Sequence, residues 1–273
     1  MSSEMSLIES ASVGLARFLY SSLQQELEPV RLARVGYALL AGGCSTRGDF
    51  PGQLLGSYLV ATQRHDGGWT DVEETVWCLA YLSAFRDRYK TQIANGVQWL
   101  GSVRLPCGAW GISDRDRPRI PVTALVVALV MDGVESEAMA WLASQWEADL
   151  ASPMQLTYKG AFFLLAHAHS KTAIGDHLVK RTVVYLNQEQ EDDGGFGPWR
   201  GHPVGSDPWS TGVALWGLSA YTAGVPAEVL TRAVSWLQSR QLPNGLWPHH
   251  YLDDGTAMAL IGMSRALPVL TGR

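Results

Sequence analysis

Residues 61–69 read Ala61-Thr62-Gln63-Arg64-His65-Asp66-Gly67-Gly68-Trp69, and Asp71-Val72-Glu73-Glu74-Thr75 follows at once. Variants of this phrase return at Gln188 to Phe196 and at Gln238 to Trp247, with a weaker copy from Trp99 through Trp110 to Thr123. Self-similarity with a period of roughly 40 residues indicates an array of repeated structural units. The fold therefore follows from reading the chain repeat by repeat.

Each repeat joins an amphipathic stretch to a nearly all-apolar stretch through a loop with glycine or proline. An amphipathic helix buries one stripe, whereas a helix that is apolar all round is buried on every side. The first kind predicts outer helices at about 7–25, 52–63, 91–103, 136–148, 174–189 and 227–240. The second kind predicts inner helices at about 30–41, 73–85, 121–131, 158–168, 208–222 and 254–266. No segment alternates with the period of a strand, so we expect an all-α protein: one α/α barrel (toroid) domain over residues 1–273, with about six inner and six outer helices.

Composition narrows the class of protein. A chain of 273 residues with 47% hydrophobic residues can bury a large core, and a net charge of −5 with interspersed signs gives no surface for nucleic acid. No run reaches the roughly 18 apolar residues of a membrane-spanning helix, and Met1 to Ser12 lacks the pattern of a secretory signal. The three cysteines, Cys44, Cys78 and Cys107, have no metal-ligand spacing and favour buried thiols in a reducing cytoplasm. We expect a cytoplasmic protein with no membrane span and no nucleic-acid partner.

The repeated phrase itself is predicted to be structural. Its glycines free the turn in φ, its aromatic ring can lie over the end of a neighbouring helix, and the preceding glutamine can cap backbone groups. Pro121 and Pro208 stand at the beginnings of inner helices, where a missing N–H costs nothing. The phrase therefore places all inner-helix starts at one rim, where helix dipoles and apolar walls surround whatever chemistry is present.

Gln-x-x-Asp-Gly-Gly-Trp before an inner helix resembles the repeat of squalene-hopene and other class II terpene cyclases and of protein prenyltransferase β subunits. The match covers nearly the whole chain, and the copy around Gln145 to Tyr158 is the most decayed. In class II cyclases the inner-helix start carries Asp-x-Asp-Asp-Thr, whose middle aspartate protonates an alkene or epoxide. Asp71-Val72-Glu73-Glu74-Thr75 is similar to a glutamate-substituted version of that motif. The resemblance implies proton-initiated cyclisation of a linear isoprenoid or meroterpenoid, with Glu73 in the place of the proton donor.

Asp254 is a second candidate for the acid, because it precedes Thr256 by two residues just as Glu73 precedes Thr75. A proton donor to carbon must keep its proton before reaction, which a neighbouring like charge and an apolar cavity both favour. Either carboxyl group can fill this role.

Three further carboxylates, Asp71, Glu74 and Asp253, are expected to tune the acid, since adjacent carboxyl groups titrate as a coupled set. The alternative for each is an N-cap or a first-turn acid, both of which helix starts favour anyway. Asp207, in Ser206-Asp207-Pro208, is interpreted first as such a cap.

Aromatic faces stabilise a carbocation without capturing it. Trp209 and Tyr158 lie at inner-helix starts and Phe162 one turn further on, so all three are candidates for the substrate cavity. His249 and His250 stand near the second acid and could relay a proton from solvent.

Arg115 and Arg117 form a basic cluster with Arg119 on a loop and could hold a diphosphate head group, or could be paired within a solvated loop. The chain carries no recognised phosphate cradle and no aspartate-rich metal motif in helical context. We expect no cofactor and no metal site, with Mg²⁺ needed only if the substrate is a diphosphate.

Three other functions stay open: a non-catalytic barrel that binds a lipid or a partner, a cyclase for a non-terpenoid substrate, and a prenyltransferase β subunit. The last is disfavoured, because Glu74-Thr75-Val76 and Gly255-Thr256-Ala257 offer no cysteine where that family binds zinc. Full-size class II cyclases usually set a second helical domain against this barrel. The resemblance therefore implies either that a homodimer or a partner domain closes the cavity, or that the cavity is small and open.

Overall fold

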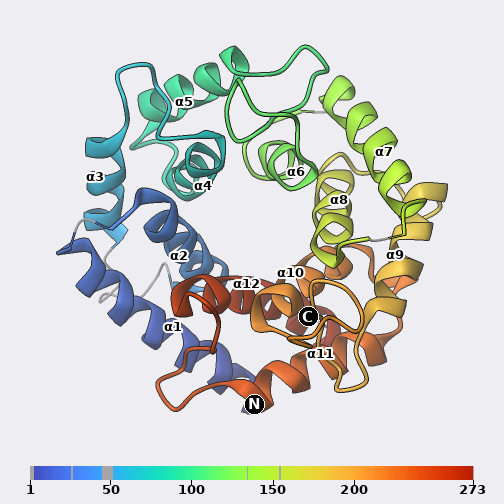
Figure 1. Cartoon of the computed structure of the whole chain (residues 1–273). Helices are drawn as coiled ribbons and strands as arrows, with labels where there is room; N and C mark the ends of the chain where they lie inside the picture. The colour runs from blue at the N-terminus through green and yellow to red at the C-terminus, as the bar shows by residue number, and fades with distance from the viewer. Residues whose placement is uncertain (1–2, 26, 45–51, 134, 154, 273) are drawn as a thin grey trace.

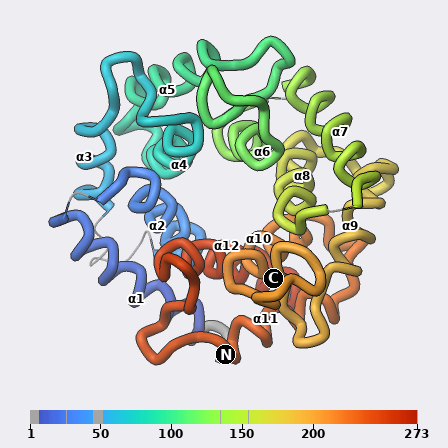
Figure 2. Tube along the Cα trace, viewed as in Figure 1, coloured from blue at the N-terminus to red at the C-terminus, as the bar shows by residue number. Residues whose placement is uncertain are grey.

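The computed structural model describes residues 3–25, 27–44, 52–133, 135–153 and 155–272. Over these residues the chain forms twelve α-helices and no strand, and Figure 1 shows the helices in two concentric rings. The outer ring comprises α1 (Ser3–Leu23), α3 (Gly52–Thr62), α5 (Lys90–Ser102), α7 (Ser136–Leu150), α9 (His177–Glu189) and α11 (Ala227–Arg240). The inner ring comprises α2 (Pro29–Ala41), α4 (Val72–Ser83), α6 (Ile120–Leu129), α8 (Thr157–His169), α10 (Pro208–Leu218) and α12 (Leu252–Thr271). The trace goes round once and brings α12 beside α2 (Figure 2), so the predicted α/α barrel is confirmed.

Several helix ends differ from the prediction by a few residues, among them the C-terminal ends of α10 and α12. The helix expected to reach residue 222 stops at Leu218 and continues as a 3-10 segment, η2 (Ser219–Gly224). Inside η2 the backbone of Tyr221 leaves helical geometry, with φ −129° and ψ 47°, and its hydroxyl donates to the carbonyl of Thr172 at 3.1 Å. α12 runs through Pro268 to Thr271 and ends at Gly272, whose left-handed φ of 66° caps the helix.

In the three copies of the phrase that carry it, the glutamine bonds to a neighbouring outer helix. Gln63 donates from Nε2 to the carbonyl of Gln92 in the first turn of α5, at 2.9 Å. Gln190 makes the equivalent bond to α11. Gln241 donates to the carbonyl of Leu7 in α1 at 3.2 Å, which links the last outer helix to the first. The predicted structural role of the phrase is confirmed.

The aromatic residue of the phrase ties its loop to both rings. The backbone N–H of Trp247 donates to the hydroxyl of Thr256 in α12 at 2.8 Å, and the indole N–H donates to the carbonyl of Leu237 in α11 at 2.7 Å. The ring is fully buried. The same backbone-to-threonine bond recurs at three other loops, those of Trp69, Trp110 and Phe196. The recurrent threonine is thus explained as an acceptor that sets the start of each inner helix.

The inner helices α10 and α12 meet through glycine. A Cβ atom built on Gly212 would collide with the backbone of Met258 and Ala259, and backbone cannot shift as a side-chain end can. We expect Gly212→Ala to lower the free energy of unfolding by about 1–3 kcal/mol. Gly101→Ala is the matched control, since a Cβ there meets nothing within 4 Å, and it should stabilise by about 0.4–1 kcal/mol. Urea unfolding measures both, and equal effects would contradict the close packing.

His167 makes the fold sensitive to acid. The imidazole is buried on α8 with its ring centroid 4.0 Å from that of Phe163, and burial lowers the pKa of His167 from 6.5 to about 4 despite the opposing charge of Asp176. The fold buries the neutral ring, so this contribution to stability is full above pH 6.5 and is lost as the pH falls towards 4. It should amount to about 3 kcal/mol at most.

The corresponding test compares wild type with His167→Leu by unfolding at several pH values. The variant should lose less stability than wild type between pH 7 and pH 4. Parallel pH curves for the two proteins would show that the imidazole is not the group responsible.

The cysteines follow the sequence prediction in part. Cys44 and Cys78 are buried, but Cys107 is exposed, so the expectation of buried thiols is wrong there. Cys107 lies in the loop after α5, directly before Gly108, where the chain turns at the surface with a φ of 82°. Among the helices that the structure describes, none is long and apolar enough to cross a membrane.

Candidate active site

The starts of the inner helices enclose a cavity of about 220 Å³. Each of the six inner helices contributes to its wall, together with the loop before α12. The lining residues are Arg34, Glu73, Trp77, Pro121, Val122, Leu125, Tyr158, Phe162, Trp209, His249, Asp254 and Met258. The wall is therefore apolar and aromatic apart from a few polar groups, as a site for a hydrocarbon substrate requires.

The two predicted acids lie together because one guanidinium holds both. Arg34, on α2, places Nη2 2.7 Å from Oε1 of Glu73 on α4, and its Nη1 donates to Oδ1 of Asp254 on α12. The same guanidinium lies over the ring of Trp77, 5.2 Å from the centroid. Three helices thus meet at one charged cluster on the cavity wall.

The electrostatics of the acid combine partial burial with nearby charges, since the Glu73 side chain is 36% exposed. Burial in the cavity raises the pKa of Glu73, the guanidinium of Arg34 opposes this, and the charges of Asp71 and Asp254 add to it. Burial also raises the pKa of Asp71, although its Oδ1 accepts from the backbone N–H of Glu74 at 2.8 Å as the N-cap of α4. A carboxyl group in this cluster therefore keeps its proton to a higher pH than an isolated carboxyl group would.

None of the three carboxylates expected to tune the acid lines the cavity: Asp71 caps the start of α4, and the other two hold α2. Glu74 accepts from the backbone N–H of Thr70 at 3.0 Å and from that of Val30 at 3.1 Å, which ties α4 to the start of α2. Asp253 is held by Arg31 through two bonds of 2.9 and 2.6 Å. Both carboxylates link α2 to its neighbours in the inner ring.

The predicted aromatic residues form one wall of the cavity. The ring of Trp209 lies edge-on to Tyr158 at 5.8 Å and to Phe162 at 6.3 Å between centroids. They belong to α8 and α10, and Figure 1 shows α8 across the ring from α2. The acid cluster and these aromatic rings therefore face the same cavity from different sides.

Of the polar residues predicted near the second acid, only His249 lines the cavity. Its Nδ1 lies 3.7 Å from Oδ1 of Asp207. Asp207 caps α10, as interpreted from sequence, by accepting from the backbone N–H of Ser210 at 2.8 Å. His250 is exposed against Tyr251 and borders a second, outer hollow.

The basic cluster lies away from this cavity wall. Arg115 and Arg117 are exposed on the loop between α5 and α6 and are not among the lining residues. Arg119 at the end of this loop pairs with Asp116 at 2.7 Å. This favours the solvated, internally paired loop over a diphosphate clamp.

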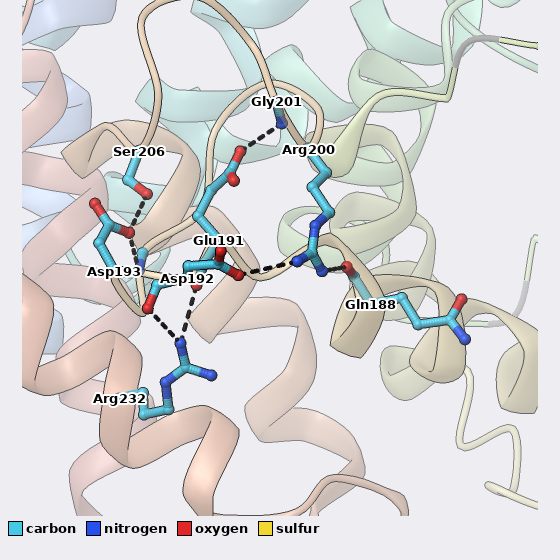
Figure 3. A network of polar contacts seen from close by, with 9 residues as sticks. Gln188, Glu191, Asp192, Asp193, Arg200, Gly201, Ser206 and Arg232 are labelled. Atoms are coloured by element: carbon cyan, nitrogen blue, oxygen red, sulfur yellow. Dashed lines mark hydrogen bonds and ion pairs between the residues drawn. The ribbon is translucent and has the colours of Figure 1, made fainter.

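A polar network holds the loop that leads into α10 (Figure 3). Arg200 bonds to the carbonyl of Gln188 at 2.7 Å and to the carboxylate of Asp192 at 3.1 Å. Asp193 accepts from the hydroxyl of Ser206 at 2.6 Å, and Arg232 on α11 donates to the carbonyl of Asp192 at 2.8 Å. Asp192 and Asp193 therefore hold this loop in place. The loop leads to the start of α10 at the rim of the cavity.

The site residues predicted from sequence did not include Arg34 or Trp77, which both line the cavity. Trp77 is fully buried yet lines the cavity floor beside the acid. The signal for Arg34 was an arginine in the middle of a helix that is otherwise buried, because a charge there requires partners. Among the described residues, no group of three or more His, Cys, Asp or Glu side chains could hold a metal ion.

Solved structures with the same architecture cover nearly the whole chain. A variant of the type II terpene cyclase MstE from Scytonema, in complex with its substrate geranylgeranyl dihydroxybenzoate, superposes with a TM-score of 0.78 at 17% identity, covering 99% of this chain and 100% of MstE. A protein from Actinoplanes superposes with a TM-score of 0.72 at 17% identity, covering 97% of this chain and 99% of the other. At these identities the likeness shows the fold.

Two curated relatives match by sequence. The squalene-hopene cyclase of Zymomonas mobilis is 25% identical over 215 residues, 64% of this chain. The drimenyl diphosphate synthase of Streptomyces showdoensis is 24% identical over 211 residues, 68% of this chain. The matches span only 32% and 39% of those longer proteins. The model of the squalene-hopene cyclase C-terminal domain matches residues 71–266, and the chain belongs to this family.

Proposed function

We propose that this barrel is a class II terpene cyclase-like enzyme that cyclises a linear isoprenoid or meroterpenoid, with Glu73 as the proton donor. One observation carries the proposal: a carboxyl group with a burial-raised pKa faces an apolar, aromatic cavity built by all six inner helices. Such a cavity suits a hydrocarbon chain, and covering it would exclude the water that would quench a cation.

The proposed reaction begins with a proton transfer from Glu73 to an alkene carbon. The remaining carbon of the double bond becomes cationic and is attacked by the next double bond of the folded chain, which closes a ring. The raised pKa of Glu73 favours its protonated form before reaction, while Asp254 forms the second ion pair with Arg34.

Charge directs where the cation develops. Arg34 covers the face of Trp77 and repels a second positive charge there. On the side of α8 and α10 the wall is aromatic, formed by Trp209, Tyr158 and Phe162. The faces of these rings stabilise a cation. Loss of a proton from carbon to the imidazole of His249 would end the sequence with a new double bond.

The relatives support the substrate class. MstE acts on a geranylgeranyl dihydroxybenzoate, and two curated relatives are a hopene cyclase and a drimenyl diphosphate synthase. An acid-initiated reaction calls for no cofactor, and Mg²⁺ enters only with a diphosphate substrate. We also propose that a second copy of the chain or a partner domain covers the cavity.

The test is turnover of a substrate panel. Purified protein is incubated in D₂O with prenyl diphosphates, squalene-like hydrocarbons and prenylated aromatics, and products are analysed by mass spectrometry. A cyclised product should carry one solvent-derived deuterium on carbon, because the initiating proton exchanges with solvent. If no member of the panel is converted but one is retained on the protein, the barrel is a binding module.

A further inference from the structure

Arg34 occupies a central place in the site that the proposed donor does not explain. Its side chain is 12% exposed, and its two terminal nitrogen atoms each hold a different carboxylate, Glu73 on α4 and Asp254 on α12. One positive charge therefore faces two acids. A single guanidinium can balance only one of them, so the second carboxyl group is the place where a proton is retained.

The same contact becomes more favourable as the proposed reaction proceeds. When Glu73 gives its proton to the substrate, a negative charge appears 2.7 Å from Nη2 of Arg34. A guanidinium beside a carboxylate stabilises the ionised form and so makes the acid stronger. Alkenes are very weak bases, and proton transfer to them is faster from a stronger acid.

We propose that Arg34 is the positioning residue that sets the acid strength of Glu73, by holding Asp254 as its permanent counter-ion and taking up the charge left on Glu73 after proton transfer. This inference rests on the proposed function. No covalent bond to Arg34 forms or breaks: the proton passes from Oε of Glu73 to an alkene carbon, and the guanidinium stays charged.

Other titratable or charged groups face the same carboxyl group and must be considered with Arg34. Asp71 comes from its own helix and Asp254 from α12. Arg119, before α6, has an electrostatic interaction with Glu73 as well as its pair with Asp116. Tyr158 of α8 and His249 line the same cavity. Among the residues that the structure describes, Arg34 alone forms ion pairs with both carboxylates, so its removal should change the titration of the cluster most.

The variants are Arg34→Met, which removes the charge and keeps the length, and Arg34→Lys, which keeps the charge. The reaction needs protonated Glu73, so activity falls at high pH as that carboxyl group ionises. This fall is the alkaline limb of the pH–activity profile. In Arg34→Met this alkaline limb should move up by about one to three pH units, because the favourable charge is gone. At the plateau kcat should fall about 10- to 100-fold, because the acid is weaker. Arg34→Lys should return the limb towards its wild-type position.

Arg31→Met is the matched control. Arg31 lies one turn earlier on α2 and pairs with Asp253 of α12, so its loss removes a similar ion pair between the same helices. Arg31 and Asp253 do not line the cavity. The alkaline limb of Arg31→Met should therefore stay in place even if the variant is less stable.

The possible outcomes separate the two proposals. An inactive Glu73→Gln together with an unmoved limb in Arg34→Met overturns the role of Arg34 and leaves the donor in place. A fully active Glu73→Gln overturns the proposed donor, and the inference falls with it. If Arg34→Met does not fold, Arg34→Lys decides: a wild-type limb with reduced kcat supports the charge, and a limb displaced as if the charge were absent contradicts it.

Discussion

Glu73→Gln is expected to abolish cyclisation, lowering kcat by about 10²- to 10⁴-fold. Glutamine keeps the size and the contact with Arg34 but has no acidic proton, so the first bond to carbon cannot form. Substrate binding should change little, because the cavity wall is otherwise apolar and aromatic. The measurement is single-turnover product formation by mass spectrometry, with binding followed by quenching of tryptophan fluorescence.

Two controls decide which carboxylate acts. Glu73→Asp keeps the acid but shortens it by one methylene, and should retain more activity than the glutamine variant. Asp254→Asn removes the other carboxylate on Arg34 and should be impaired less than Glu73→Gln. The reverse order would make Asp254 the donor and would contradict our assignment.

Trp247→Ala is expected to be among the most damaging changes to the fold, lowering the free energy of unfolding by about 3–5 kcal/mol. The ring is fully buried, and its indole N–H satisfies the carbonyl of Leu237. Removing the ring leaves a cavity between the outer helix α11 and the inner helix α12, and leaves that carbonyl without its partner. Chemical unfolding followed by circular dichroism measures the change.

The chain supplies the control for this prediction. Phe196 occupies the equivalent place in another repeat, is fully buried and keeps the backbone bond to its threonine, Thr211, at 2.9 Å. Trp247→Phe should therefore cost only about 1–2 kcal/mol, mainly from the lost indole hydrogen bond. Equal losses for the alanine and phenylalanine variants would show that buried ring volume is not what stabilises this rim.

Much of the fold could be predicted because the repeated phrase is local. The aromatic residue of one copy bonds to the helices on either side of its loop, and its glutamine bonds to its own loop and to the next outer helix, so a period in the sequence becomes a period in space. The ends of α10 and α12 were less predictable. The backbone turn at Tyr221 depends on its hydroxyl reaching Thr172, which lies on another part of the chain.

The candidate site was likewise predictable only in part. Glu73, Asp254 and Trp209 were placed correctly at the cavity because each stands at a fixed distance from a repeated threonine or proline. Glu74 has the same kind of position in the sequence, but its side chain turns to the start of α2. One step along a helix changes the direction of a side chain by about 100°, and only packing decides which direction meets the cavity.

By itself, then, the sequence determined the barrel, the rim at which its inner helices begin and the carboxylates that stand there, since the pattern that predicts each of these lies within one repeat. Only the tertiary structure decided the charge partners. Arg34 lies 39 residues from Glu73 and 220 residues from Asp254 along the chain. It meets Glu73 because α2 and α4 are neighbouring inner helices, and it meets Asp254 because the ring closes and brings α12 beside α2. Ion pairs between elements so distant in sequence have no local pattern, because closure of the whole ring is what brings them into contact.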